Sequence, residues 1–109
     1  MAPAAQFAAL ADETRCAIVD RLRERPQAVH ELAAAFPISR PAISRHLRVL
    51  REAGLVDETR DGRENVYSLK RHRLRMLSNW LEQHWSSRLE RLKALAEQEP
   101  PEPQMEMDI

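Results

Sequence analysis

The residues best suited to contact a nucleic acid lie in residues 39–53, SRPAISRHLRVLREA. If this segment is helical, its turn of about 100° per residue gathers small and polar side chains on one face. Arginine can donate two hydrogen bonds to guanine, serine can bond a base or a phosphate, and an alanine methyl can touch thymine. The pattern therefore predicts a recognition helix that lies in the major groove of DNA. Its outward face carries Pro41, Ala42, Ser44, Arg45, Arg48 and Glu52.

Apolar residues mark the opposite face of this helix. Ile43, Leu47 and Leu50 repeat at spacings of four and three, which is the period of a helix packed against a core. Ser39 is a good N-cap, because its hydroxyl can accept a hydrogen bond from an unpaired amide of the first turn. Gly54 suits the left-handed conformation that ends many helices. The recognition helix is therefore expected between these two residues.

Another short helix is expected just before it. Residues 29–36 (VHELAAAF) place Val29, Leu32 and Phe36 on an inward face, and residues 37–38 form a turn. Two helices joined by so short a turn, the second with a polar outer face, are typical of a helix-turn-helix.

A β-hairpin is expected after the recognition helix. Residues 55–59 alternate as a strand, residues 66–69 belong to a second strand, and residues 60–63 (RDGR) supply the turn. Asp-Gly is among the strongest hairpin patterns. The hairpin would form a wing, with Arg60 and Arg63 at its tip, able to reach the DNA backbone or the minor groove.

Two helices are expected at the start of the chain. Residues 4–10 form the first, and Asp12 can cap a second that runs to about Arg25 and is stopped by Pro26. With a long last helix, the order is four helices, two strands and one helix. The sequence thus predicts a mainly α fold of the α+β class, a winged helix-turn-helix.

The last helix, from about Arg73 to Gln98, carries apolar residues at near-heptad spacing. The elements before it already cover the thin core of so small a domain, and an exposed apolar stripe usually marks an interface. We expect a homodimer joined through the first and last helices, with two recognition helices about 34 Å apart on an inverted repeat. Alternatively, the last helix folds back on its own domain. The predicted interface residues are Phe7, Leu10, Leu77, Trp80, Leu81, Trp85, Leu89 and Leu92.

The charge distribution supports a nucleic-acid partner, although the net charge of the 109 residues is zero. Residues 38–75 hold 10 Arg or Lys against 5 Asp or Glu, a net charge of +5. The basic excess coincides with the predicted recognition helix and wing, and local charge matters more to a polyanion than the total. Residues 1–97 are expected to be one domain, and the acidic, proline-rich residues 98–109 a disordered tail.

Several function classes are excluded by composition. One cysteine, Cys16, allows no internal disulfide and fits a reducing cytosol. No secretory leader and no apolar run of 18 residues is present, so a cytoplasmic protein without membrane contact is expected. Two glycines allow no glycine-rich phosphate loop, no nucleophile–base set is evident, and the four histidines are scattered. We therefore expect no enzyme, no metal and no cofactor.

Three segments, LADETRCAIVDRLRE, HELAAAFPISRPAISRHLRVLREAGLV and DGRENVYSL, resemble the ArsR/SmtB family of bacterial winged-helix repressors over about residues 5–97. The resemblance implies a homodimer, an operator near the regulator's own promoter, and release by an effector. It also implies DNA contact at the positions of Ser39, Arg40, Ser44, Arg45 and His46 and at the wing tip from Arg60 to Arg63.

One departure from the family concerns metal sensing. Metal-sensing members carry a cysteine pair in the helix that here reads HELAAAF, or Asp/His and His/Glu pairs along the last helix. In this chain the last helix has only His84, with Glu82 two residues away on a different face. The sequence therefore resembles the metal-independent branch, with an unknown effector. Two alternatives stay open: a winged-helix module that binds protein, and a thiol-responsive sensor acting through Cys16, against the expectation of a buried or half-buried structural thiol.

Overall fold

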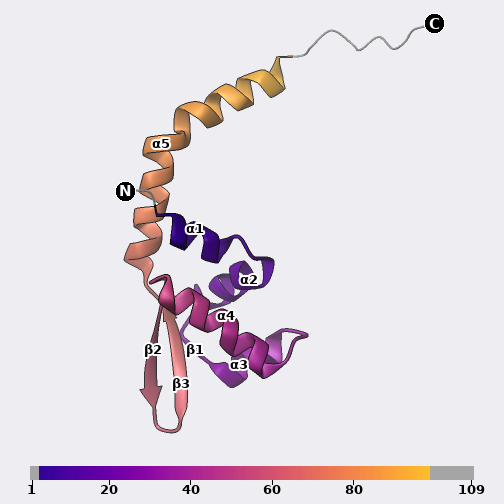
Figure 1. The fold of residues 1–109 in the computed structure, drawn as a ribbon, viewed down its shortest axis with the longest axis vertical. Helices are drawn as coiled ribbons and strands as arrows, with labels where there is room; N and C mark the ends of the chain where they lie inside the picture. The colour runs from indigo at the N-terminus through magenta and orange to yellow at the C-terminus, as the bar shows by residue number, and fades with distance from the viewer. Residues whose placement is uncertain (1–2, 99–109) are drawn as a thin grey trace, which may run out of the picture. The chain divides into compact units, whose positions relative to one another are not determined.

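The computed structural model describes residues 3–98, which form five helices and three strands (Figure 1). The chain divides into two compact units between Leu77 and Ser78: an N-terminal unit that ends at Leu77 and a C-terminal unit that begins at Ser78. The predicted tail at residues 98–109 lies, apart from Gln98, outside the described residues. The elements are α1 (Ala4–Leu10), α2 (Glu13–Leu22), β1 (Gln27–Ala28), α3 (Val29–Ala35), α4 (Arg40–Glu52), β2 (Val56–Asp61), β3 (Glu64–Leu69) and α5 (Arg71–Glu97).

The predicted helices and the hairpin are confirmed. Asp12 caps α2 by accepting a hydrogen bond from the Arg15 amide at 2.9 Å. Helix α2 ends at Leu22, three residues before the predicted end, because the chain already turns at residues 23–24. In Figure 1 the β2–β3 hairpin extends beside α3 and α4 as a wing.

A third strand, β1, was not predicted. Gln27 pairs with Tyr67 and Ala28 with Val66, so β1 lies antiparallel to β3 in a sheet of order β1-β3-β2. The buried Gln27 side chain donates to the Arg21 carbonyl at 2.9 Å, which ties the strand to α2. Two residues are too few to show the alternation by which a strand is recognised in sequence.

The turn of the wing lies one residue later than expected. Asp61 pairs with Glu64, which leaves Gly62 and Arg63 as the two turn residues. Gly62 has φ +65°, and no non-glycine residue described has a positive φ. Glycine first, followed by a residue with negative φ, is the pattern of a type II′ turn, which matches the twist of a hairpin. The prediction that Asp-Gly fills the turn was therefore wrong by one position, and Arg60 lies within β2, opposite Asn65.

The core of the N-terminal unit is built around α4. The C-terminal end of α4 is fixed by two backbone hydrogen bonds, from the Leu55 amide to the Leu50 carbonyl at 3.0 Å and from the Gly54 amide to the Arg51 carbonyl at 2.9 Å. With Gly54 at φ +79°, this is a Schellman motif. The fully buried side chains come from three helices, α2, α3 and α4, and from the chain that enters the wing: Ile18, Leu22, Leu32, Ile43, Leu47, Leu50, Leu55 and Val56.

The C-terminal unit comprises, among the described residues, the rest of α5. Leu77, the last residue of the N-terminal unit, is 6% exposed and belongs to that unit's core, whereas Leu89 is 55% and Leu92 64% exposed. Within residues 3–98, no helix has a run long and apolar enough to cross a bilayer.

Candidate nucleic-acid interface

The two faces of α4 differ sharply in exposure. The apolar stripe is fully buried, whereas Arg45 and Arg48 are exposed. Neither guanidinium has a hydrogen-bond or ion-pair partner among the described residues. All their donors are therefore available to a ligand, on a helix whose back is held by the core. Of the residues predicted for this face, Pro41, Ser44, Arg45, Arg48 and Glu52 are exposed and Ala42 is half-buried; Ser39 and Arg40 at the start of the helix are exposed as well.

Ser39 fixes the beginning of α4. Its hydroxyl oxygen accepts a hydrogen bond from the Ala42 amide at 3.2 Å, as the sequence predicted, and its carbonyl accepts from the Ile43 amide at 3.1 Å. Arg40 and Pro41 are the first two helical residues. Replacing such a cap by alanine costs about 1 kcal/mol, so Ser39 has a structural role besides any contact with DNA.

His46 is half-buried and lies beside the start of α2. Its Nδ1 lies 3.2 Å from an Arg15 guanidinium nitrogen and 3.9 Å from an Asp12 carboxylate oxygen. Arg15 also donates to the Ala9 carbonyl at 2.7 Å, and its amide is the main reason that the pKa of Asp12 lies below its ordinary value. His46 thus takes part in a polar contact that joins the ends of α1 and α2 to the recognition helix.

The wing presents its arginines differently. Arg63 is exposed in the turn, and its side chain has no partner among the described residues. Arg60 is exposed on β2 and donates through Nε to the Gly62 carbonyl at 3.1 Å. Arg63 and Arg40 line the same small hollow, so the wing turn and the start of the recognition helix come together there.

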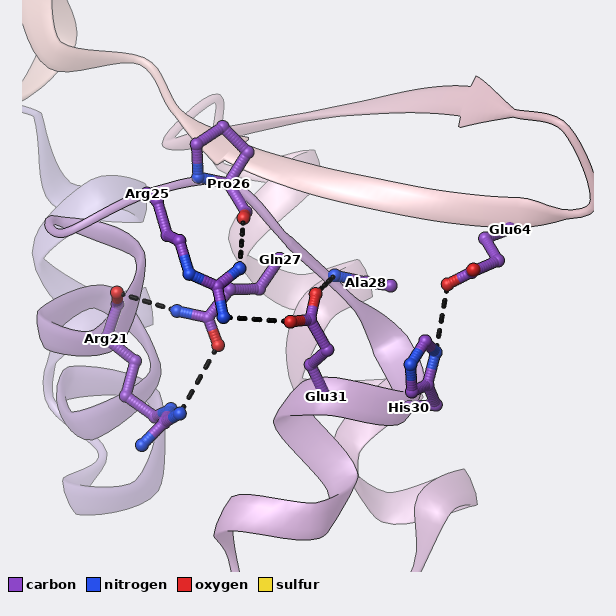
Figure 2. A network of polar contacts seen from close by, with 8 residues as sticks. All are labelled: Arg21, Arg25, Pro26, Gln27, Ala28, His30, Glu31 and Glu64. Atoms are coloured by element: carbon purple, nitrogen blue, oxygen red, sulfur yellow. Dashed lines mark hydrogen bonds and ion pairs between the residues drawn. The ribbon is translucent and has the colours of Figure 1, made fainter.

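A polar network anchors this region to α2 (Figure 2). Arg25 donates to a Glu31 carboxylate oxygen at 2.8 Å, and the other Glu31 oxygen accepts from the Ala28 amide at 2.9 Å. The hydrogen bond from Arg25, followed by that from Ala28, holds the pKa of Glu31 below its ordinary value. In the same view His30 reaches Glu64 at the start of β3, with Nδ1 2.9 Å from a carboxylate oxygen. Sequence reasoning missed this pair, because nothing local relates two residues so far apart in the chain.

The base of the wing is fixed to α4 by Glu58. Its carboxylate pairs with Arg51 of α4 and accepts a hydrogen bond from the Tyr67 hydroxyl at 3.0 Å. Burial, helped by this hydrogen bond, raises the pKa of Tyr67 to about 12. Glu58 thereby joins α4, β2 and β3 through charge-assisted contacts.

The predicted interface residues differ in their surroundings. Phe7 and Leu10 pack half-buried against the core, and Leu77 is part of it. Trp80 is half-buried and stacks on the His84 ring, with centroids 4.5 Å apart, whereas Leu81 and Trp85 are exposed. Arg88 lies over the Trp85 ring, 5.4 Å from its centroid. The apolar stripe without cover therefore consists of Leu81, Trp85, Leu89, Leu92 and Leu95.

Cys16 is exposed, which corrects the expectation of a buried or half-buried thiol. On α2 it falls on the far side from Ile18 and Leu22, and its Sγ donates to the Leu10 carbonyl at 2.8 Å. In residues 3–98, no three or more His, Cys, Asp or Glu side chains are grouped so as to hold a metal ion.

Comparison with known proteins agrees with this architecture. The model of the bacterial regulatory protein family arsR matches residues 12–58, which cover α2 to the first half of β2. The HTH-type transcriptional regulator Rv2034 of Mycobacterium tuberculosis (strain H37Rv) is 46% identical over 87 residues, 80% of this chain and 81% of that protein. The arsenical resistance operon repressor of Escherichia coli K12 is 36% identical over 94 residues, 85% of this chain and 80% of that protein.

The fold is shared as well. A crystal structure described as a possible transcriptional regulator for arsenical resistance is 45% identical, with a TM-score of 0.74 over 82% of this chain and 93% of that one. Proteins of this kind regulate transcription and are not enzymes. The winged helix-turn-helix, the exposed arginine face of α4 and this similarity lead to one conclusion: the chain belongs to the ArsR family of bacterial regulatory proteins and is a DNA-binding transcriptional repressor.

Proposed function

We propose that the protein is a homodimeric repressor that binds an inverted-repeat operator, including one at its own promoter, and is released by a signal other than a metal ion. Regulators of this family bind DNA operators and typically act as dimers. The observation that carries the proposal is the exposed, unpaired pair Arg45 and Arg48 on a helix whose other face is fully buried.

The DNA contacts are divided between bases and backbone. Residues on the exposed face of α4 contact base edges, because arginine, serine and small residues have the donors and shapes that the major groove recognises. Residues at the start of α4 and on the wing contact phosphates, which fix the position of the protein on DNA. The first group is Pro41, Ala42, Ser44, Arg45 and Arg48; the second is Ser39, Arg40, Arg60 and Arg63, with His46 at the border between them.

The dimer is proposed to form through α1 and α5. The uncovered stripe on α5 is too apolar to leave in water, and a symmetric partner offers the same stripe. Helix α1 offers a second apolar surface, since Ala5 and Ala8 border a hollow of about 330 Å³ together with Val49 and Ala53 of α4. Large side chains from α5 of a second copy could fill this hollow. Residues 1–97 would then be the DNA-binding and dimerisation domain, working in the cytoplasm where its DNA target lies.

Selection from random-sequence DNA tests the proposal. The purified chain should enrich duplexes that carry two related half-sites in inverted orientation, with centres about one helical turn apart. Its mass in solution, measured by analytical ultracentrifugation, should be that of two chains, and its affinity should fall steeply with salt. Binding that ignores salt would instead favour a module that binds protein. Enrichment of a single half-site by a monomer would contradict the dimer.

A further inference from the structure

A small hollow separates the wing turn from the start of α4. It has a volume of about 90 Å³ and is lined by Ala28, Val29, His30, Arg40, Arg63, Glu64 and Asn65. Since about 10–15 Å³ of such space holds one water molecule, two non-bridging oxygens of a phosphate fit. Two guanidiniums without partners, an imidazole and an amide line it, against one carboxylate. Its chemistry is therefore that of an anion site.

The carboxylate in this hollow is unfavourably placed unless it is neutralised. Glu64 lies directly opposite Asp61 across the hairpin, and like charges in that position destabilise a strand pair. The side chain that contacts the Glu64 carboxylate is His30, with Nδ1 2.9 Å from a carboxylate oxygen, and this contact is an ion pair only when the imidazole is protonated. Figure 2 shows the His30 ring extending from α3 toward Glu64. Protonation of His30 would therefore offset the Glu64 charge and make this hollow more favourable for a phosphate.

We propose that this hollow binds one backbone phosphate of the operator in each half-site, and that binding takes up a proton on His30. The inference rests on the proposed function, because it assigns a further DNA contact to the same interface. Neutral imidazole has one N–H; if that donor serves Glu64 through Nδ1, then Nε2 has only a lone pair to offer the phosphate. The protonated ring donates through Nδ1 to the carboxylate and through Nε2 to a phosphate oxygen.

The groups around His30 define the charge balance. Glu31 is next to His30 on α3 and is paired with Arg25, and Glu64 faces His30 from β3. Arg40 of α4 and Arg63 of the turn line the hollow. A phosphate entering between the two free guanidiniums adds negative charge next to the ring and so favours the protonated form. By linkage, operator affinity then rises as the pH falls.

The test measures operator affinity of the full chain as a function of salt at pH 8 and pH 5.5. Between pH 8 and pH 5.5, the operator affinity of the unmodified protein should rise about tenfold more than that of His30→Gln, since a charge-assisted hydrogen bond is worth on the order of tenfold. The slope of log affinity against log salt should steepen at pH 5.5 by about 0.9 for each half-site, and His30→Gln should abolish this increment.

Two further variants complete the design. Glu64→Gln should bind more tightly than the unmodified protein at pH 8, because a negative charge next to the phosphate is removed. Its affinity should also depend less on pH, because the carboxylate that stabilises protonated His30 is gone. The matched control is His72→Gln, an exposed histidine outside the hollow, which should keep the pH dependence of the unmodified protein. If the unmodified protein and His30→Gln bound the operator with equal pH dependence, this inference would be overturned and the proposed function would stand. Absence of operator binding by the unmodified protein at both pH values would overturn the proposed function and this site with it.

Discussion

Leucine side chains on the helices of the two units differ in solvent exposure. On α4 of the N-terminal unit, Leu47 and Leu50 are 0% exposed, whereas on α5 of the C-terminal unit, Leu89 and Leu92 are more than half exposed. Both sets have helical spacing, so periodicity alone does not separate them. The difference shows that the N-terminal unit buries its leucines in its own core, whereas the C-terminal unit leaves its leucines exposed; the proposed dimer would cover them.

Polar contacts follow the same division. In the N-terminal unit they join different elements, as Arg15 does between α1 and α4 and Glu58 does between α4 and the wing. In the C-terminal unit, by contrast, His84 contacts Trp80 and Arg88 lies over the Trp85 ring, and each of these contacts lies within one turn of α5. Contacts between elements hold a tertiary structure, whereas contacts within a turn support only the helix.

The largest expected effect comes from making the same substitution in both units. Leu47→Ala should lower the free energy of unfolding by about 2–5 kcal/mol, because it leaves a cavity in a closed core. Leu89→Ala leaves no such cavity, and its effect should appear mainly as a weaker dimer, with a thermal midpoint that depends on protein concentration. Thermal unfolding at several concentrations measures both. Equal losses that do not vary with concentration would contradict the difference drawn between the units.

Trp85→Asp should break the C-terminal unit's proposed interface while the DNA-binding unit stays folded. A charge in the middle of an apolar contact is costly to bury, so sedimentation should show monomers. Operator affinity should fall by about a hundredfold or more, because the two half-sites are no longer bound by one molecule. The circular dichroism of the variant should stay close to that of the unmodified chain, and an unchanged dimer would place the interface elsewhere.

Arg45→Ala tests the exposed face of α4. If its guanidinium contacts a guanine, the variant should lose about 1–3 kcal/mol of binding free energy and tolerate other bases at one position in each half-site. A repeat of the random-DNA selection with the variant measures this directly. Uniform weakening across all sequences would instead make Arg45 a phosphate contact.

Arg63→Ala should have the reverse signature. Its affinity for every duplex should fall by a similar factor, and the salt slope should decrease by about 1 for each half-site, as expected when a phosphate contact is lost. Fluorescence anisotropy with the operator and with an unrelated duplex gives both quantities. A change in base preference at the flanks of the operator would mean that the wing reads sequence.

Local chemistry explains which parts of the fold the sequence could predict. The Ser39 cap, the Gly54 stop and the apolar spacing of α4 act within a few residues, so they could be found without the structure. The exposure of Arg45 and Arg48 could be predicted in the same way, from the helical spacing of α4. Strand β1 could not be found, because two residues carry no period and their pairing with β3 joins distant parts of the chain.

The unpredicted parts of the site share this cause. His30 meets Glu64, and His46 meets Arg15, only because the tertiary fold brings separate elements together. Leu77 and Leu89 could not be told apart either, since the heptad pattern continues through the boundary where the core ends. In both cases the missing information is long-range packing, which a residue pattern does not contain.

The smallest expected effect concerns the network at the end of α2. Glu31 has a lowered pKa in the folded protein, so its contribution to stability is present at neutral pH and is lost as the pH falls through its titration. Arg25→Gln should move the pKa of Glu31 back toward its ordinary value without fully restoring it, because the Ala28 amide still donates to the carboxylate. A titration of the side-chain carboxyl by NMR measures the change.

The control for this variant comes from the other unit. Arg88→Gln removes a guanidinium whose contacts stay within one turn of α5, so the titration of Glu31 should not change. If Arg25→Gln also left that titration unchanged, the bond from Arg25 to Glu31 would be absent in solution. Because this bond joins the segment after α2 to α3, its loss would remove one of the contacts between separate segments that distinguish the DNA-binding unit from the helix of the other unit.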